Sequence, residues 1–171
     1  MTSGHEASPD QTPSSGLMAS SGPMLSSDLA TLYLRQREAM VRLARLLTGS
    51  MGAAEEVVQE AFLRMHQQRT QPDNPAGYLR TTVANISRSH MRRLRLERRV
   101  GSPDRVTFDE PVIDETWAAV RRLPFRQRAV LALRFYEDLP EAEIARVLGC
   151  RLGTVKSSLH RGLAKLRDEL T

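Results

Sequence analysis

The residues with the clearest chemical potential are the basic side chains near the C-terminal end of the chain. The stretch 151–167 carries five Lys and Arg residues and no Asp or Glu. A helix face that only meets water usually mixes both signs of charge, so an acid-free stretch of this length is uncommon. Lys and Arg side chains bind phosphates and the edges of nucleic-acid bases. The stretch therefore predicts a surface for a polyanion.

The spacing of small and apolar residues around this stretch predicts two helices, over 140–148 and 153–170, joined by a tight turn. Ala145 is small enough for a second helix to cross it, Gly149 tolerates a positive φ, and Val155 faces back toward the first helix. We expect the leucines that follow at helical spacing to extend this buried stripe: Leu159, Leu163, Leu166 and Leu170. This pattern is typical of a DNA-binding helix-turn-helix.

The face of the second helix opposite Val155 holds the side chains that would reach a DNA groove. None of them is a carboxylate: Arg151, Thr154, Lys156, Ser157, His160 and Arg161. Their types suit contacts to base edges and phosphates. An ordinary helical hairpin is the alternative interpretation of the spacing alone, and the basic face argues against it.

Charge changes sign along the rest of the chain. Residues 77–100 hold seven arginines against one acid, Glu97. Residues 103–116 hold five acids against one arginine, Arg105. Two basic segments therefore flank an acidic one, and the whole chain of 171 residues has a formal net charge of +5. A basic balance favours a polyanionic partner.

Apolar periodicity predicts an all-α protein of two small helical domains, the second containing the helix-turn-helix. Helices are expected from residue 28 to a stop at Gly49, over 53–68, from 75 past 92, and over 125–136. The Gly- and Pro-containing acidic stretch 101–114 reads as a flexible linker. The predicted organisation is a disordered extension (1–27), a first domain (28–100), the linker (101–114) and a second domain (115–171).

Several function classes lack the residues they need. The chain has one cysteine and four scattered histidines, so we expect no disulfide and no metal site. Nucleotide-binding and catalytic motifs are missing, which predicts a protein that is not an enzyme and needs no cofactor. No apolar run is long enough to cross a membrane, and residues 1–27 lack the pattern of a signal peptide, so we expect a cytoplasmic protein without a membrane or small-molecule partner.

Several stretches together resemble one family. The stretch GTVKSSLHRGLAKLR, preceded by EIARVLG and LPFRQRAVLALRFYEDL, looks like the promoter-binding domain of extracytoplasmic-function sigma factors. The stretches AEEVVQEAFLR and GYLRTTVANISRSHMRR look like helices of that family's N-terminal domain. The resemblance implies a sigma factor that binds core RNA polymerase, directs it to promoter DNA and promotes melting. It also implies that an anti-sigma factor is a candidate partner.

The resemblance also implies roles for particular residues. A polymerase-docking helix would use Glu55, Glu56, Gln59, Glu60 and Arg64. Contacts to the −10 element and its melted strand would come from Tyr78, Asn85, Arg88, Arg92 and Arg93. Unpaired bases are held by aromatic stacking, edge hydrogen bonds and basic grooves, so these side-chain types suit that task. The −35 element would be read by the groove-facing side chains of the second helix, although Ser158 stands where the family commonly has arginine.

Two alternative functions stay open on the sequence. A free-standing helix-turn-helix regulator would bind operators as a dimer, without the polymerase. An interaction protein would use residues 28–100 only as a partner-binding bundle. The arginine-rich stretch 77–100 of the first domain argues against the dimeric regulator. The acid-free helix at 151–167 argues against the interaction protein.

Overall fold

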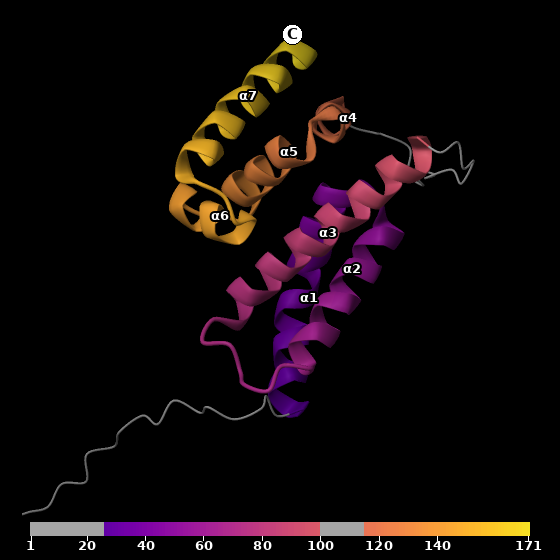
Figure 1. The fold of residues 1–171 in the computed structure, drawn as a ribbon, viewed down its shortest axis with the longest axis vertical. Coiled ribbons are helices and arrows are strands. Elements are labelled where there is room, and N and C mark those ends of the chain that lie inside the picture. Colours follow the sequence, from indigo (N-terminus) through magenta and orange to yellow (C-terminus); the bar gives the residue numbers. More distant parts are fainter. Residues whose placement is uncertain (1–25, 100–114) are drawn as a thin grey trace, which may run out of the picture.

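The computed structural model describes residues 26–99 and 115–171, and every regular element in those ranges is a helix (Figure 1). The all-α prediction is confirmed. The expected linker at 101–114 lies outside the described residues, as does the expected disordered extension at 1–27 except for its last two residues. Those two begin the first helix.

The N-terminal bundle consists of three helices that pack against one another: α1 (Ser26–Thr48), α2 (Met51–His66) and α3 (Pro75–Arg99). α1 ends as expected at Gly49, whose φ of +81° suits a residue without a side chain. Ser50 then caps α2, because its Oγ accepts a hydrogen bond from the Ala53 amide at 3.4 Å. Fully buried side chains from all three helices form the core: Met40, Leu43, Leu47, Met65, Leu79 and Val83.

The C-terminal group contains α4 (Glu115–Arg122), α5 (Phe125–Leu131), the π-helix η1 (Ala132–Tyr136), α6 (Glu141–Leu148) and α7 (Leu152–Leu170). The expected continuous helix over 125–136 is thus α-helical only in its first part. The Glu137 amide donates to the Ala132 carbonyl, five residues back, so the chain leaves α5 through a widened turn.

The turn between α6 and α7 has the predicted geometry. Gly149 adopts φ +60° and ψ +44°, and the Cys150 amide donates to the Ala145 carbonyl at 3.0 Å. Val155 is fully buried, as its spacing predicts. The turn and the inward residue therefore orient α7 across α6 as a helix-turn-helix requires.

The buried stripe of α7 differs from the predicted one. Leu163 and Leu170 are 39% and 46% exposed, whereas Ser158 and Gly162 are buried. α7 approaches α5 closely at Gly162, where an added Cβ would lie 3.0 Å from a Leu131 methyl group. This close approach turns the Gly162 side of the helix inward and leaves Leu163 on the flank.

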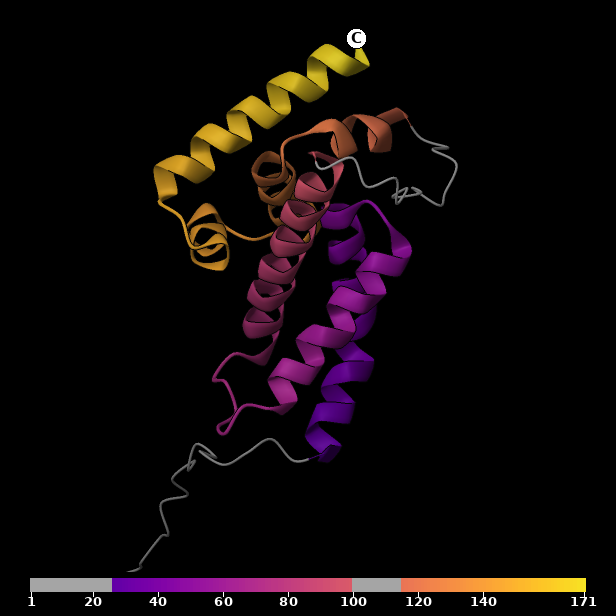
Figure 2. The ribbon, with the colours of Figure 1, turned by 45° about the vertical axis from the view of Figure 1, so that its right-hand side comes forward.

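The C-terminal group packs directly against the N-terminal bundle (Figure 2). The guanidinium of Arg128 donates to the Leu47 carbonyl in α1, and Arg88 of α3 donates to the Leu148 carbonyl at 3.0 Å. Arg80 of α3 forms an ion pair with Glu137 just after η1. One hydrophobic core runs through both parts. The sequence predicted two domains but not this packing between them.

Candidate nucleic-acid and partner interfaces

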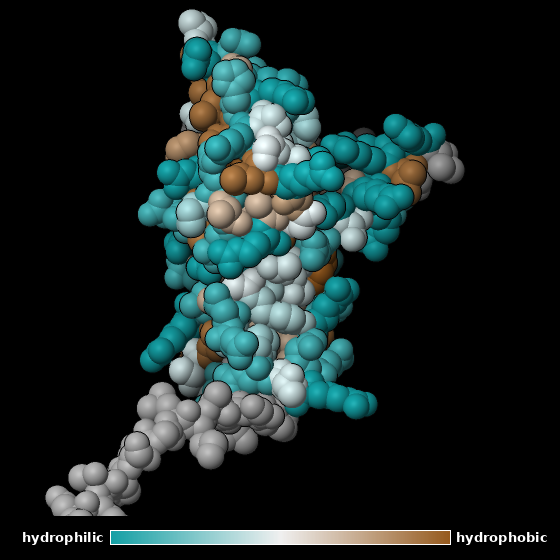
Figure 3. Space-filling view, turned by 60° about the vertical axis from the view of Figure 1, so that its left-hand side comes forward, coloured by the Kyte–Doolittle hydropathy of each residue, from teal (hydrophilic) through white to brown (hydrophobic). Residues whose placement is uncertain are grey.

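The outer face of α7 presents the predicted groove-facing side chains. Arg151, Lys156, His160 and Arg161 are exposed, whereas Thr154 and Ser157 are half-buried. The Ser157 hydroxyl donates to the Thr154 carbonyl at 3.1 Å, which holds it along the helix. Figure 3 views the molecule from the side of α6 and α7, where hydrophilic residues surround a smaller hydrophobic patch. The exposed Lys and Arg side chains of α7 suit a polyanion.

Ser158 points into the C-terminal group rather than toward this face. Its residue is only 7% exposed, and it lies on the same side of α7 as the buried Val155. A side chain at position 158 of this chain faces the C-terminal group, so having serine there instead of arginine does not remove a positive charge from the exposed face.

A stripe of polar and basic residues runs along α3. Tyr78, Asn85, Arg88 and Arg92 follow one another at intervals of seven, three and four residues, which places them on one side of the helix. Arg93 lies off this stripe and pairs with Glu97 at 3.5 Å. The structure thus brings four of the five predicted −10 residues together and separates the fifth.

The Tyr78 ring sits at the end of this stripe, half-buried, and its hydroxyl accepts a hydrogen bond from Gln68 at 2.9 Å. Tyr78 also lines a cleft of about 250 Å³ between α3 and α6, together with Glu143 and Arg146. Because Arg88 donates to α6 as well, the C-terminal group borders one flank of the stripe while Asn85 stays exposed.

The α2 surface carries the predicted acidic and polar residues. All of them are exposed or half-buried: Glu55, Glu56, Gln59, Glu60 and Arg64. Glu60 pairs with Arg64 at 2.7 Å, and Glu55 with Arg37 of α1 at 3.5 Å. Such exposed pairs add little stability. This surface is therefore available for a partner without loss of the fold.

Sequence reasoning missed Leu63, which is 49% exposed on the same surface. It follows Glu60 by three residues and Gln59 by four, so it lies among the polar side chains of α2. Interfaces commonly place an apolar side chain inside a polar rim. The available signal was a leucine that breaks an otherwise polar helix face.

His90 lies beside the arginines of α3 without adding to their charge. Burial lowers the pKa of His90, and nearby Arg93 lowers it further, although Glu56 and Glu97 oppose these effects. The imidazole is therefore neutral at neutral pH.

Within residues 26–99 and 115–171, no group of His, Cys, Asp and Glu side chains could hold a metal ion. No helix among the same residues is long and apolar enough to span a membrane.

Family models match both parts of the chain. Residues 32–97 match "Sigma-70 region 2" and residues 113–166 match "Sigma-70, region 4". The first match covers most of the N-terminal bundle and the second covers most of the C-terminal group.

Curated relatives cover most of the chain. It is 34% identical to the RNA polymerase sigma-E factor of Streptomyces coelicolor in an alignment of 151 positions that covers 81% of this chain and 84% of that protein. It is 33% identical to the ECF RNA polymerase sigma factor SigL of Mycobacterium tuberculosis, across 81% of this chain and 86% of the relative. It is also 33% identical to the ECF RNA polymerase sigma factor SigE of Mycolicibacterium smegmatis, but spans only 60% of that longer protein.

Solved structures share the fold. The sigma factor RpoE of Bartonella quintana, crystallised with the anti-sigma factor NepR, aligns over 84% of this chain and 97% of its own with a TM-score of 0.70 and 21% identity. CnrH, solved with the cytosolic domain of CnrY, aligns over 85% of this chain and 89% of its own with a TM-score of 0.62 and 23% identity.

Proposed function

The chain belongs to the extracytoplasmic-function family of RNA polymerase sigma factors, and on that premise we propose that it binds core RNA polymerase, directs it to specific promoters and promotes DNA melting. The observation that supports this most strongly is the pair of distinct surfaces on one chain. The α3 stripe suits single-stranded DNA, and the outer face of α7 suits a duplex groove.

Melting is assigned to the α3 stripe. Asn85 can hydrogen-bond the edge of an unpaired base, Tyr78 offers an aromatic ring for stacking, and Arg88 and Arg92 can hold the backbone of the same strand. Arg88 is engaged with α6 in the packed chain, so its use in DNA binding requires the C-terminal group to move away.

Recognition of the −35 element is assigned to α7. Lys156, His160 and Arg161 lie exposed on its outer face, and Arg151 stands at its N-terminus, where helix amides favour a phosphate. The helix-turn-helix supplies the rigid support that a base-reading helix needs.

The alternative of a free-standing dimeric regulator is not favoured. Such a regulator needs one helix-turn-helix and a dimer interface, and it has no use for a second nucleic-acid stripe on α3. The proposed role makes the chain a specificity subunit rather than a catalyst and places it in the cytoplasm with the polymerase. An anti-sigma factor as a further partner stays a prediction of the family resemblance.

Docking on the polymerase is assigned to the polar surface of α2 with Leu63 at its centre. We expect Leu63→Asp to weaken binding to core polymerase by roughly tenfold or more, because a carboxylate cannot replace an apolar contact at an interface centre. The measurement is co-elution with purified core polymerase over a concentration series.

Leu34→Asp is the matched control, because Leu34 is 82% exposed on α1 and lies outside this surface. It should co-elute like the unmodified chain. Equal binding of both variants would remove α2 from the polymerase interface, and failure of the unmodified chain to co-elute would contradict the proposed function.

Arg161 and Lys156 are expected to differ on mutation. The planar guanidinium of Arg161 can pair with guanine bidentately, so Arg161→Ala should cost about 1–3 kcal/mol at one base pair and relax preference there. The Lys156 ammonium suits a phosphate, so Lys156→Ala should weaken binding to all sequences and lower the salt slope by about one.

The measurement is binding of the polymerase holoenzyme to a library of single substitutions in the −35 element at two salt concentrations. A uniform loss across all sites for Arg161→Ala would reassign Arg161 to the DNA backbone.

A further inference from the structure

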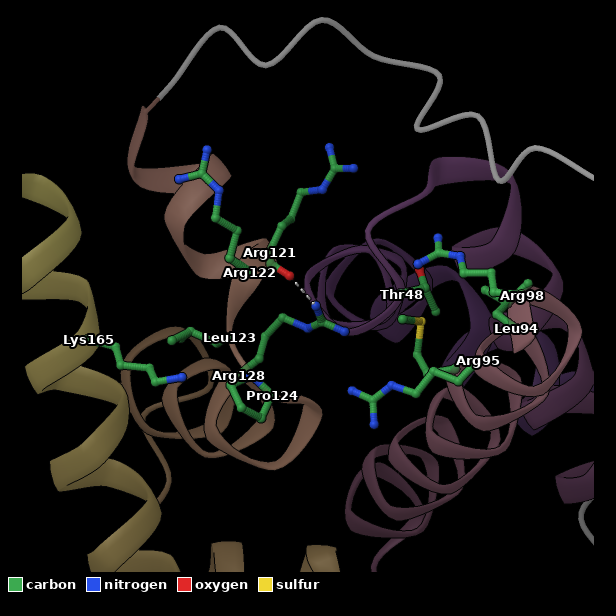
Figure 4. Close-up of a pocket in the computed structure, with 11 residues that line it drawn as sticks. Thr48, Leu94, Arg95, Arg98, Arg121, Arg122, Leu123, Pro124, Arg128 and Lys165 are labelled. Atoms are coloured by element: carbon green, nitrogen blue, oxygen red, sulfur yellow. Dashed lines mark hydrogen bonds between the residues drawn. The ribbon is translucent and has the colours of Figure 1, made fainter. Parts of the chain in front are cut away.

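A pocket of about 480 Å³ lies where the N-terminal bundle meets the C-terminal group, and cationic side chains dominate its lining (Figure 4). They come from both parts of the chain: Arg95 and Arg98 of α3, Arg121 and Arg122 of α4, Arg128 of α5 and Lys165 of α7. No Asp or Glu is among the described residues that line it. The pocket is not part of the α3 stripe or of the α7 face described above.

The cations of this pocket are only partly balanced within the described chain. Arg122 pairs with Glu169 at 3.0 Å, and Arg121 has interactions of its own. Arg95, Arg98, Arg128 and Lys165 form no ion pair with any residue that the structure describes. Packing of the two parts thus collects like charges, which favours a bound anion.

Arg128 is the cation of this pocket that is buried and held in place by hydrogen bonds. It is only 4% exposed, and its Nη1 donates to the Arg121 carbonyl at 2.9 Å while its Nη2 donates to the Leu47 carbonyl. Its Nε is buried without a hydrogen-bond partner. Burial, together with the nearby positive charges of Arg95 and Arg121, lowers the pKa of Arg128 to about 10. A negative charge in the pocket would relieve this unfavourable environment.

The remaining lining indicates the kind of anion. Arginine forks bind phosphate oxygens through pairs of hydrogen bonds. Met91, Leu94, Leu123 and Pro124 form an apolar part of the wall, and the volume lies within the range of small-molecule sites. We propose that this pocket binds a small phosphate polyanion, a di- or triphosphate either free or carried by a nucleoside, that bridges α3 and the C-terminal group.

This inference goes beyond the proposed function and does not depend on it, because it concerns the free chain. A ligand that contacts both parts stabilises their packed arrangement in proportion to its occupancy. The bound anion should therefore raise the thermal midpoint of the full chain.

The test is calorimetric titration of the full chain with sodium tripolyphosphate at about 150 mM salt, where diffuse electrostatic attraction is screened beyond about 8 Å. We expect saturable binding with one site per chain. The double variant R95Q/K165Q should lose roughly tenfold or more in affinity, because two charge-assisted contacts are gone. Both residues are exposed, so the fold should persist.

The double variant R99Q/R167Q is the matched control. It removes the same charge from the same two helices, at exposed positions outside the pocket lining. Its affinity should change less than about twofold, and tripolyphosphate should still raise its thermal midpoint.

Three results would overturn the proposal: no binding by the unmodified chain, equal losses in both double variants, or equal binding of uncharged guanosine. Guanosine triphosphate without divalent metal separates the two sources of the ligand. Affinity equal to that of tripolyphosphate identifies the phosphates alone, and tighter binding identifies a nucleotide whose base uses the apolar wall; both support the proposal. The titration contains no polymerase, so its outcome does not depend on the proposed function. The proposed function is tested separately by co-elution with core polymerase.

Discussion

Replacing Arg128 by alanine is expected to lower the free energy of unfolding by roughly 2–4 kcal/mol. The side chain satisfies two backbone carbonyls, one at Arg121 and one at Leu47, and the variant leaves both without this donor. The buried aliphatic stem also leaves a cavity. The loss is smaller than the sum of these effects, because the charge is itself costly where burial lowers the pKa of Arg128 to about 10.

The measurement is urea denaturation followed by far-ultraviolet circular dichroism. Arg126→Ala is the matched control, because Arg126 is an exposed neighbour in the same helix. It should change the free energy of unfolding by less than about 0.5 kcal/mol. An equal free energy of unfolding in the two variants would contradict this prediction and show that the hydrogen bonds of Arg128 add no net stability.

Asn85→Ala is expected to reduce formation of the open promoter complex by roughly tenfold or more while leaving polymerase binding unchanged. A bidentate pair of hydrogen bonds to one base edge is worth about 1–3 kcal/mol, and the Asn85 amide is exposed on the α3 stripe. Alanine also favours helix, so the fold should not suffer.

Permanganate reactivity of the melted thymines measures this effect directly, and co-elution with core polymerase measures binding. Gln36→Ala is the control, because it removes an amide from α1, outside the three proposed surfaces. Normal reactivity in Asn85→Ala would withdraw Asn85 from strand capture, whereas a parallel loss of polymerase binding would indicate a docking role instead.

The helices could be predicted because their signals are local. The apolar periodicity over 53–68 predicted the helix that α2 forms, and apolar residues at this helical spacing, Val58, Phe62 and Met65, are buried. Gly49 and Gly149 both adopt the positive φ that a turn after a helix requires. These features depend on neighbours within a few residues.

The packing between the two parts could not be predicted, because it depends on contacts far apart in the chain. Arg128 reads as one of many surface arginines in the sequence, yet it bonds a carbonyl in α1. Leu163 and Leu170 fit a buried stripe by spacing, but the close approach at Gly162 determines which side of α7 faces inward. Side-chain spacing alone does not report how near a neighbouring backbone comes.

The candidate surfaces that lie on a single helix could be predicted, whereas the pocket formed by several helices could not. Helical spacing places Tyr78, Asn85, Arg88 and Arg92 on one side of α3, and that arrangement needs no tertiary information. The cationic pocket needs α3, α4, α5 and α7 to meet, so no pattern within one helix could reveal it.

The most direct test of the proposed function is run-off transcription with purified core RNA polymerase on genomic fragments of the organism that encodes the chain. The chain should generate transcripts with defined start points that core polymerase alone does not make, and Asn85→Ala should reduce them. A polymerase that initiates no differently with the chain present, together with tight sequence-specific binding of DNA by the chain alone, would contradict the assignment as a sigma factor.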